Sequence, residues 1–203
     1  DRDMKKFIFL ILIAIIFTVC NSCSNGPPYI KKLPPLSKVP GIGVNFIIPD
    51  EEGWMLFDPD GKGSMIVKHG PSEKESYVIS LDFYNQSKPK TLSEFQTLYN
   101  TLKDRELKTP RYKSIVANEN QKIDNGDFFI EFYYLVEDHE ASNMPKDAEF
   151  MLLETMGIFA VNPEISDNLV RVAYSHRYLP NNKDRQFRKK ANWVLENVTF
   201  ISQ

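Results

Sequence analysis

One strand-like segment carries side chains that could bind or activate a substrate. Apolar and polar residues alternate over 169–178, so that Tyr174, His176 and Tyr178 share a face. Histidine can act as a general base near neutral pH, and Tyr174, His176 and Arg177 together could bind an anion. The simpler interpretation is a partly buried histidine that is hydrogen-bonded within the core. The sequence therefore leaves two hypotheses for this segment, a core histidine and a speculative binding patch.

A second candidate for chemistry is the run Glu137-Asp138-His139-Glu140. Carboxylate oxygens bind hard cations, and imidazole binds zinc or copper. Consecutive residues in a loop rarely converge on one ion, so a solvated loop is the favoured interpretation. Asn143 stands where a second histidine would complete a zinc-binding helix. We therefore predict no metal and no cofactor.

Other patterns that indicate catalysis or ligand binding are incomplete. The chain has no G-x-S-x-G motif and only three histidines. Segment 58–63 has the spacing of a calcium loop, but Lys62 and His69 stand where carboxylates are needed. Segment 41–43 lacks the third glycine of a dinucleotide-binding motif. The sequence favours a protein that is not an enzyme.

The amino-terminal residues have the composition of an export signal. Two lysines precede an apolar run over 7–19, in which Thr18 is the one polar residue, and the small residue Ser22 precedes Cys23. The run is shorter than the roughly 20 apolar residues that span a bilayer. We predict that residues 1–22 are a signal peptide.

Segment 19–23 resembles the lipobox of bacterial lipoproteins, in which signal peptidase II cleaves before a cysteine that carries diacylglycerol. Ser22 fits the small residue before the cut and Cys23 the modified cysteine, whereas Cys20 occupies a position where leucine is usual. The resemblance implies a lipid anchor on Cys23 and a domain that faces the periplasm or the cell exterior. By analogy with enteric lipoproteins, Ser24 implies sorting to the outer membrane. An ordinary cleaved signal or an uncleaved anchor are the alternatives.

Composition limits the remaining possibilities. The chain has 203 residues and a net charge of −2, which is too little positive charge for a nucleic-acid partner. Both cysteines lie at the end of the predicted signal, so that the remainder cannot form a disulfide or a cysteine metal site. In addition to the membrane, which the lipid anchor would contact, we expect a protein or another envelope component as the partner.

The rest of the chain divides into a predicted tether and a predicted domain. Residues 23–40 begin with the lipidated cysteine and are rich in proline, which fixes φ and removes a hydrogen-bond donor. This composition indicates an extended tether. Residues 41–203 are long enough for a single globular domain with its own core.

Within this domain, the hydrophobic pattern predicts strands before and after a central helix. Asn125-Gly126 is typical of a hairpin turn. Segment 149–161 is ambiguous, because its length allows a helix while its β-branched and glycine residues favour a strand. The strands are expected at 44–48, 53–57, 64–69, 76–84, 112–121, 127–137 and 169–178.

Two segments have the periodicity of amphipathic helices. Thr91-Leu92-Ser93-Glu94 is a capping box, and apolar residues recur after it at helical spacing until Pro110. Segment 183–196 carries a second apolar stripe, and its basic residues are most simply a solvated face. We predict an α+β fold, with an antiparallel sheet of about 6–8 strands packed by two helices.

The start of the domain resembles PsbP-like proteins, which include the Ran-binding Mog-type proteins and the periplasmic DcrB-type lipoproteins. Segment 46–49 forms a strand that ends in proline, and Gly53-Trp54 follows it. The resemblance covers 42–201 by the order of elements, and it implies a PsbP-like α/β/α sandwich in a family of mostly non-enzymatic binding or assembly factors. We expect Trp54 to pack beneath a helix.

These observations favour a membrane-anchored lipoprotein of the bacterial cell envelope with a non-catalytic accessory or binding domain. The alternative is an envelope hydrolase or a small-ligand-binding protein that uses a pocket centred on His176.

Overall fold

The computed structural model describes residues 29–41, 43–58, 65–72, 74–124, 127–164 and 168–201. The predicted signal peptide and Cys23 lie outside these residues, as does the predicted turn Asn125-Gly126. The elements in chain order are β1 (Tyr29–Lys32), β2 (Lys38–Pro40), β3 (Val44–Ile47), β4 (Met55–Asp58), β5 (Met65–His69), β6 (Ser76–Asn85), α2 (Leu92–Leu107), β7 (Tyr112–Asp124), β8 (Asp127–Asp138), β9 (Met151–Val161), β10 (Asn168–Tyr178), α3 (Phe187–Glu196) and β11 (Val198–Phe200).

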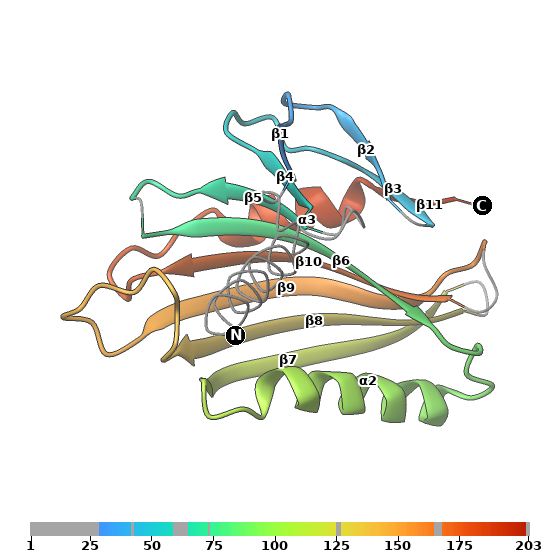
Figure 1. Cartoon of the computed structure of the whole chain (residues 1–203). Helices are drawn as coiled ribbons and strands as arrows, with labels where there is room; N and C mark the ends of the chain where they lie inside the picture. Colours follow the sequence, from blue (N-terminus) through green and yellow to red (C-terminus); the bar gives the residue numbers. More distant parts are fainter. Residues whose placement is uncertain are drawn as a thin grey trace, which may run out of the picture.

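The described strands form a large sheet and a small one (Figure 1). The large sheet has eight strands in the order β1-β4-β5-β6-β10-β9-β8-β7, and the small sheet has the order β11-β3-β2. All pairs are antiparallel. The predicted α+β class, with an antiparallel sheet and two packing helices, is confirmed.

The predicted tether is corrected by the first two strands. β1 pairs with β4 and β2 pairs with β3, so residues 29–40 belong to the folded domain. Leu33 and Val39 are buried, and the backbone N–H of Leu33 donates to the carbonyl of Trp54 at 2.9 Å. The prolines misled the prediction because proline is tolerated at strand ends and sheet edges. The domain thus includes Tyr29 and does not begin at Gly41.

Helix α2 begins where the capping box predicts. The Thr91 side chain accepts a hydrogen bond from the backbone N–H of Glu94 at 3.2 Å. The Glu94 carboxylate accepts in turn from the backbone N–H of Lys90 at 2.7 Å. Phe95 and Tyr99 are buried against β8, β9 and β10, with Phe159 stacked on Phe95. We call this side of the large sheet the α2 face.

The ambiguous segment 149–161 proves to be a strand, β9, which lies between β8 and β10. Central position explains its apolar composition, because a strand covered on both faces needs no polar alternation. Gly157 faces the ring of Phe132 on β8, and a Cβ at this glycine would lie 2.4 Å from that ring. Glycine is therefore required there by the close approach of a neighbouring strand.

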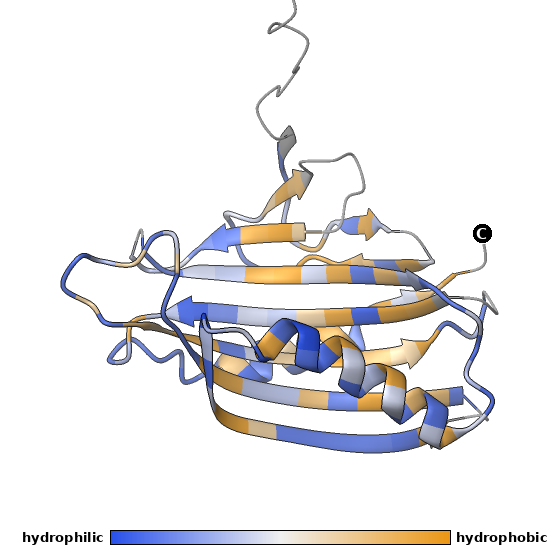
Figure 2. Ribbon diagram, turned by 60° about the horizontal axis from the view of Figure 1, so that its bottom comes forward, coloured by the Kyte–Doolittle hydropathy of each residue, from blue (hydrophilic) through white to orange (hydrophobic). Residues whose placement is uncertain are grey.

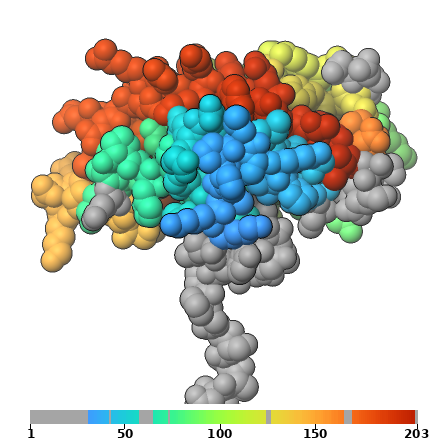
Figure 3. All heavy atoms as spheres, turned by 90° about the horizontal axis from the view of Figure 1, so that it is seen from above, coloured from blue at the N-terminus to red at the C-terminus, as the bar shows by residue number. Residues whose placement is uncertain are grey.

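The opposite side of the large sheet, which we call the α3 face, is covered by α3 and by the small sheet. Phe187, Ala191 and Val194 of α3 are buried in one cluster with Phe46 of β3. β11 follows α3 directly and pairs with β3, so the last strand of the described chain joins β2 and β3 in the small sheet. The amino-terminal strands accordingly lie beside the carboxy-terminal segment when the molecule is viewed from above (Figure 3).

Trp54 belongs to the same cluster on the α3 face. It is 1% exposed, and its ring centre lies 6.3 Å from that of Tyr174. Gly53 before it has a φ of 93°, a left-handed conformation that favours glycine. The sequence predicts that Trp54 packs beneath a helix, and Trp54 is buried in the cluster that contains the core residues of α3.

Candidate functional site

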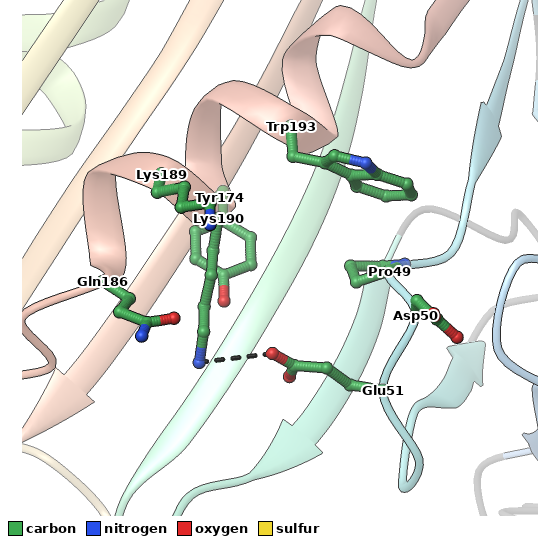
Figure 4. A pocket seen from close by; sticks show the side chains of 8 residues that line it. All are labelled: Pro49, Asp50, Glu51, Tyr174, Gln186, Lys189, Lys190 and Trp193. Carbon is green, nitrogen blue, oxygen red and sulfur yellow. Dashed lines mark ion pairs between the residues drawn. The ribbon is translucent and has the colours of Figure 1, made fainter.

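A pocket of about 290 Å³ lies on the α3 face, between α3 and the loop that follows β3. We call it the α3 pocket (Figure 4). Trp193 of α3 and Pro49 of the loop form an apolar wall, and Tyr174 of β10 lies at the base. The pocket is open to solvent, so it can accept a side chain or a peptide segment that remains partly hydrated.

An ion-pair network crosses the mouth of the α3 pocket. The Lys190 ammonium lies 3.3 Å from Glu51 and 3.0 Å from Asp184, and Figure 4 shows Lys190 and Glu51 pointing toward one another. Burial opposes the charge of Lys190, but the hydrogen bond to Asp184 and the charge of Glu51 raise its pKa. Burial likewise works against the Glu51 carboxylate, but Lys68 and Lys190 lower its pKa. The network is therefore fully charged at neutral pH and fixes α3 to the β3–β4 loop.

His176 lies deeper, beneath this network. Its ring is stacked between Tyr77 and Tyr178, with ring centres 4.1 and 4.6 Å away, and the side chain is fully buried. Neither ring nitrogen has a hydrogen-bond partner within the described chain, and Nε2 lies 3.8 Å from Glu75. Burial lowers the pKa of His176 to about 4, against the opposing charges of Asp184 and Glu75. The imidazole is therefore neutral at pH 7.

The buried carboxylates near His176 are held by other side chains. Glu75 is 2% exposed and accepts hydrogen bonds from Ser72 and Asn182. Glu154, opposite His176 on β9, accepts from the hydroxyls of Tyr133 at 2.7 Å and Tyr178 at 3.3 Å. Burial and this hydrogen bond raise the pKa of Tyr133 to about 12. These groups stabilise one another, and neither Glu75 nor Glu154 lines the α3 pocket.

The structure divides the patch that the sequence proposed. Tyr174 and His176 lie on the α3 face, but Arg177 points to the α2 face, because successive side chains of a strand alternate. Its Nε lies 3.0 Å from Asp138, on the other side of the sheet from the α3 pocket. Of the three, only Tyr174 lines the α3 pocket. The proposed joint anion site is therefore wrong.

The acidic run 137–140 does not converge on one point. Asp138 is fully buried and accepts hydrogen bonds from Nε and Nη2 of Arg111 at 2.7 and 2.8 Å. Glu137 lies on the opposite face of β8 and contacts Lys113 and His139. Alternation along the strand again explains the separation.

Sequence reasoning named Tyr174 but missed the other residues that line the α3 pocket. Lys190 is part of a basic run that the sequence assigns to a solvated face, yet it is half-buried and paired with Glu51, which lies 139 positions earlier in the chain. Trp193 is apolar and lies near the core stripe of α3 in sequence. No local pattern could have joined these residues, because the contact depends on how β3 and α3 meet.

Comparisons with known proteins gave matches among solved structures alone. No family model and no curated protein sequence matches the chain. Among solved structures, cyanobacterial PsbP (CyanoP) from Synechocystis sp. PCC 6803 is 14% identical with a TM-score of 0.44. The match covers 89% of this chain and 98% of the PsbP chain. The Ran-binding protein Mog1p from Saccharomyces cerevisiae is 12% identical with a TM-score of 0.39, and the match covers 86% of this chain and 97% of the Mog1p chain. Protein PA94 from Pseudomonas aeruginosa is 14% identical with a TM-score of 0.36, and the match covers 79% of this chain and 96% of the PA94 chain.

These similarities concern the course of the chain alone. They agree with the PsbP-like fold that the opening strand and Gly53-Trp54 suggest in the sequence. At such identities and scores they carry no information about the ligand or partner of this protein. Neither α2 nor α3, the helices of the described chain, is long and apolar enough to cross a membrane.

Proposed function

We propose that this protein is a non-catalytic binding domain held at a membrane of the bacterial cell envelope by a lipid on Cys23. The anchor rests on the sequence, where Ser22-Cys23 follows a short apolar run. Outer-membrane attachment, with the domain facing the periplasm or the cell exterior, follows from the lipobox analogy and Ser24. The partner is an envelope component or another protein, and not a nucleic acid.

The observation that carries the non-catalytic assignment is the burial of His176. A general base must come within about 3 Å of the proton that it removes. His176 is fully buried between two tyrosine rings and does not line the α3 pocket. This geometry argues against a hydrolase or a small-ligand site that uses His176.

The α3 pocket supports a binding role. Trp193 is half-buried and offers aromatic surface, and tryptophan is enriched among the residues that dominate binding energy at interfaces. Asp50, Glu51 and Lys189 provide charges of both signs around that surface. A partner segment with an apolar side chain and flanking polar groups would complement it.

Replacement of the cysteine tests the anchor. Cys23→Ala should abolish labelling with radioactive palmitate and leave a larger, uncleaved precursor, because the acyl acceptor is lost. Cys20→Ala, three positions earlier, is the matched control and should label like the wild type. Equal labelling of Cys23→Ala and the wild type would contradict the anchor.

Site-directed crosslinking tests the binding surface in cells. A photo-crosslinking residue in place of the exposed Lys189 should give a covalent adduct, and the same residue in place of the exposed Lys122 on β7 should not. Trp193→Ala should remove the adduct while thermal unfolding shows that the domain is still folded. Equal adducts from both positions would show that the α3 pocket is not the contact.

A further inference from the structure

A second hollow, of about 460 Å³, lies on the α2 face, between the last turns of α2 and strands β5, β6 and β10. We call it the arginine groove. Figure 2 shows α2 crossing one part of the sheet and leaving strands beside it without a helix above them. The groove and the α3 pocket share no lining residue and lie on opposite faces of the large sheet.

Small and apolar side chains form the floor of the groove. Ser80 of β6 and Ser175 of β10 are half-buried, and Val78 and Leu153 flank them. The Ser175 hydroxyl lies 3.0 Å from that of Thr155. This floor provides both hydroxyl donors and apolar contact area to a ligand, and no described helix covers it.

Three arginines and two acids line the groove, so its walls carry a positive excess. Arg171 is neutralised, because it contacts Asp82 at 2.9 Å and Glu106 at 3.0 Å. Arg105 is exposed in the last turn of α2 and makes no ion pair with any residue that the structure describes. The excess charge therefore lies with Arg105 and Arg177.

Arg177 is short of acceptors. Its only carboxylate contact in the described chain is Asp138, whose two oxygens already accept from Arg111. The Nε of Arg177 is buried, and although it lies 3.0 Å from Asp138 it lacks the geometry of a hydrogen bond. One buried carboxylate thus serves two guanidinium groups, and the terminal amino groups of Arg177 remain available at the groove.

We propose that the arginine groove binds an extended acidic segment of a partner protein. The planar guanidinium group pairs with a carboxylate through two parallel hydrogen bonds, and Arg177 and Arg105 can each donate to one side-chain carboxylate. Apolar side chains between the acids rest on Val78 and Leu153. This floor favours a peptide over an inorganic anion, which would gain nothing from apolar contacts. The proposal depends on neither the lipid anchor nor the α3 pocket.

The test is a fluorescence anisotropy titration of the detergent-solubilised full chain with a labelled peptide of alternating aspartate and leucine. The control peptide has asparagine in place of each aspartate. The acidic peptide should bind about tenfold more tightly, the ratio expected for one charge-assisted hydrogen bond. Inorganic phosphate should not displace it. Equal binding of the two peptides, or displacement by phosphate, would overturn the proposal.

Matched arginine variants locate the site. Arg105→Gln should weaken binding of the acidic peptide by about threefold to tenfold. Arg185→Gln removes the same charge from an exposed position before α3, on the other face, and should leave binding unchanged. Arg177→Lys keeps the charge at Asp138 but loses the planar fork, and it should weaken binding without unfolding the domain. Equal effects of Arg105→Gln and Arg185→Gln would refute the proposed location.

Discussion

Strand β10 contributes to both faces of the large sheet, and its two sets of side chains meet opposite environments. On the α3 face, Tyr174, His176 and Tyr178 are each at most 1% exposed. On the α2 face of the same strand, Arg171 and Arg177 are only half-buried. Neighbours in sequence such as His176 and Arg177 therefore differ in their access to water, although Leu169 and Ala173 on the α2 face of β10 are also buried.

The difference comes from what covers each face. α3 and the small sheet together close the α3 face, whereas α2 reaches only part of the other. Titratable groups under full cover have only protein groups around them: Glu154 accepts hydrogen bonds from two tyrosines, whereas His176 is stacked between two tyrosine rings and its ring nitrogens have no hydrogen-bond partner among the described residues. Charged groups under partial cover keep their charge and can meet a ligand. How far other elements cover each face of the sheet, more than residue type, decides which polar side chains can contact a ligand.

Loss of the largest buried ring on the α3 face should have the largest effect. Trp54→Ala removes a side chain that is 1% exposed, and it should lower the free energy of unfolding by about 3–5 kcal/mol. Val78→Ala, on the floor of the arginine groove, should cost less than about 1 kcal/mol because its side chain is half-exposed. Urea unfolding measures both values. Equal losses of unfolding free energy in the two variants would mean that the two faces of the sheet are equally covered.

Low pH should destabilise the folded protein through His176, which is buried on the α3 face. Burial lowers the pKa of His176 from its ordinary value of 6.5 to about 4, so between these values the unfolded chain binds a proton that the folded chain excludes. Stability is then full above about pH 6.5, and it falls by roughly 3 kcal/mol as the pH drops toward 4. Glu75, Asp184 and Lys190 are the charged groups near the ring.

Unfolding measured across this pH range tests the prediction. His176→Gln should flatten the dependence between pH 6.5 and 4, whereas His139→Gln, at an exposed position, should retain it. The carboxyl groups of Asp138 and Asp184 have lowered pKa values, so their contributions are lost only below the ordinary carboxyl range. An unchanged slope in His176→Gln would show that this histidine does not carry the effect.

The smallest expected effect concerns the partial cover of the α2 face. Thr91→Ala removes the side chain that caps α2 and should cost about 1 kcal/mol. Thr97→Ala, in the same helix, removes an exposed methyl group and a hydroxyl that donates to the carbonyl of Ser93, and it should be neutral or slightly stabilising. Hydrogen exchange should accelerate in α2 but not in α3 in the first variant. Faster exchange in both helices would mean that the two faces are energetically coupled.

The sequence by itself determined the elements whose signals are local. Alternation located β6 and β10, Thr91 and Glu94 located the start of α2, and the strands on either side of the predicted Asn125-Gly126 turn pair as expected. These rules act within a few residues, since they follow from the strand period, the helix period and the unpaired groups at a helix end.

Only the tertiary structure decided which segments met. Residues 29–40 have the prolines of a tether but gain strand partners, and 149–161 is a strand because it lies between two others. His176 and Arg177 are adjacent in sequence, yet one is sealed in the core and the other borders a groove. Burial depends on groups far away in the chain, and no local pattern of residue types carries that information.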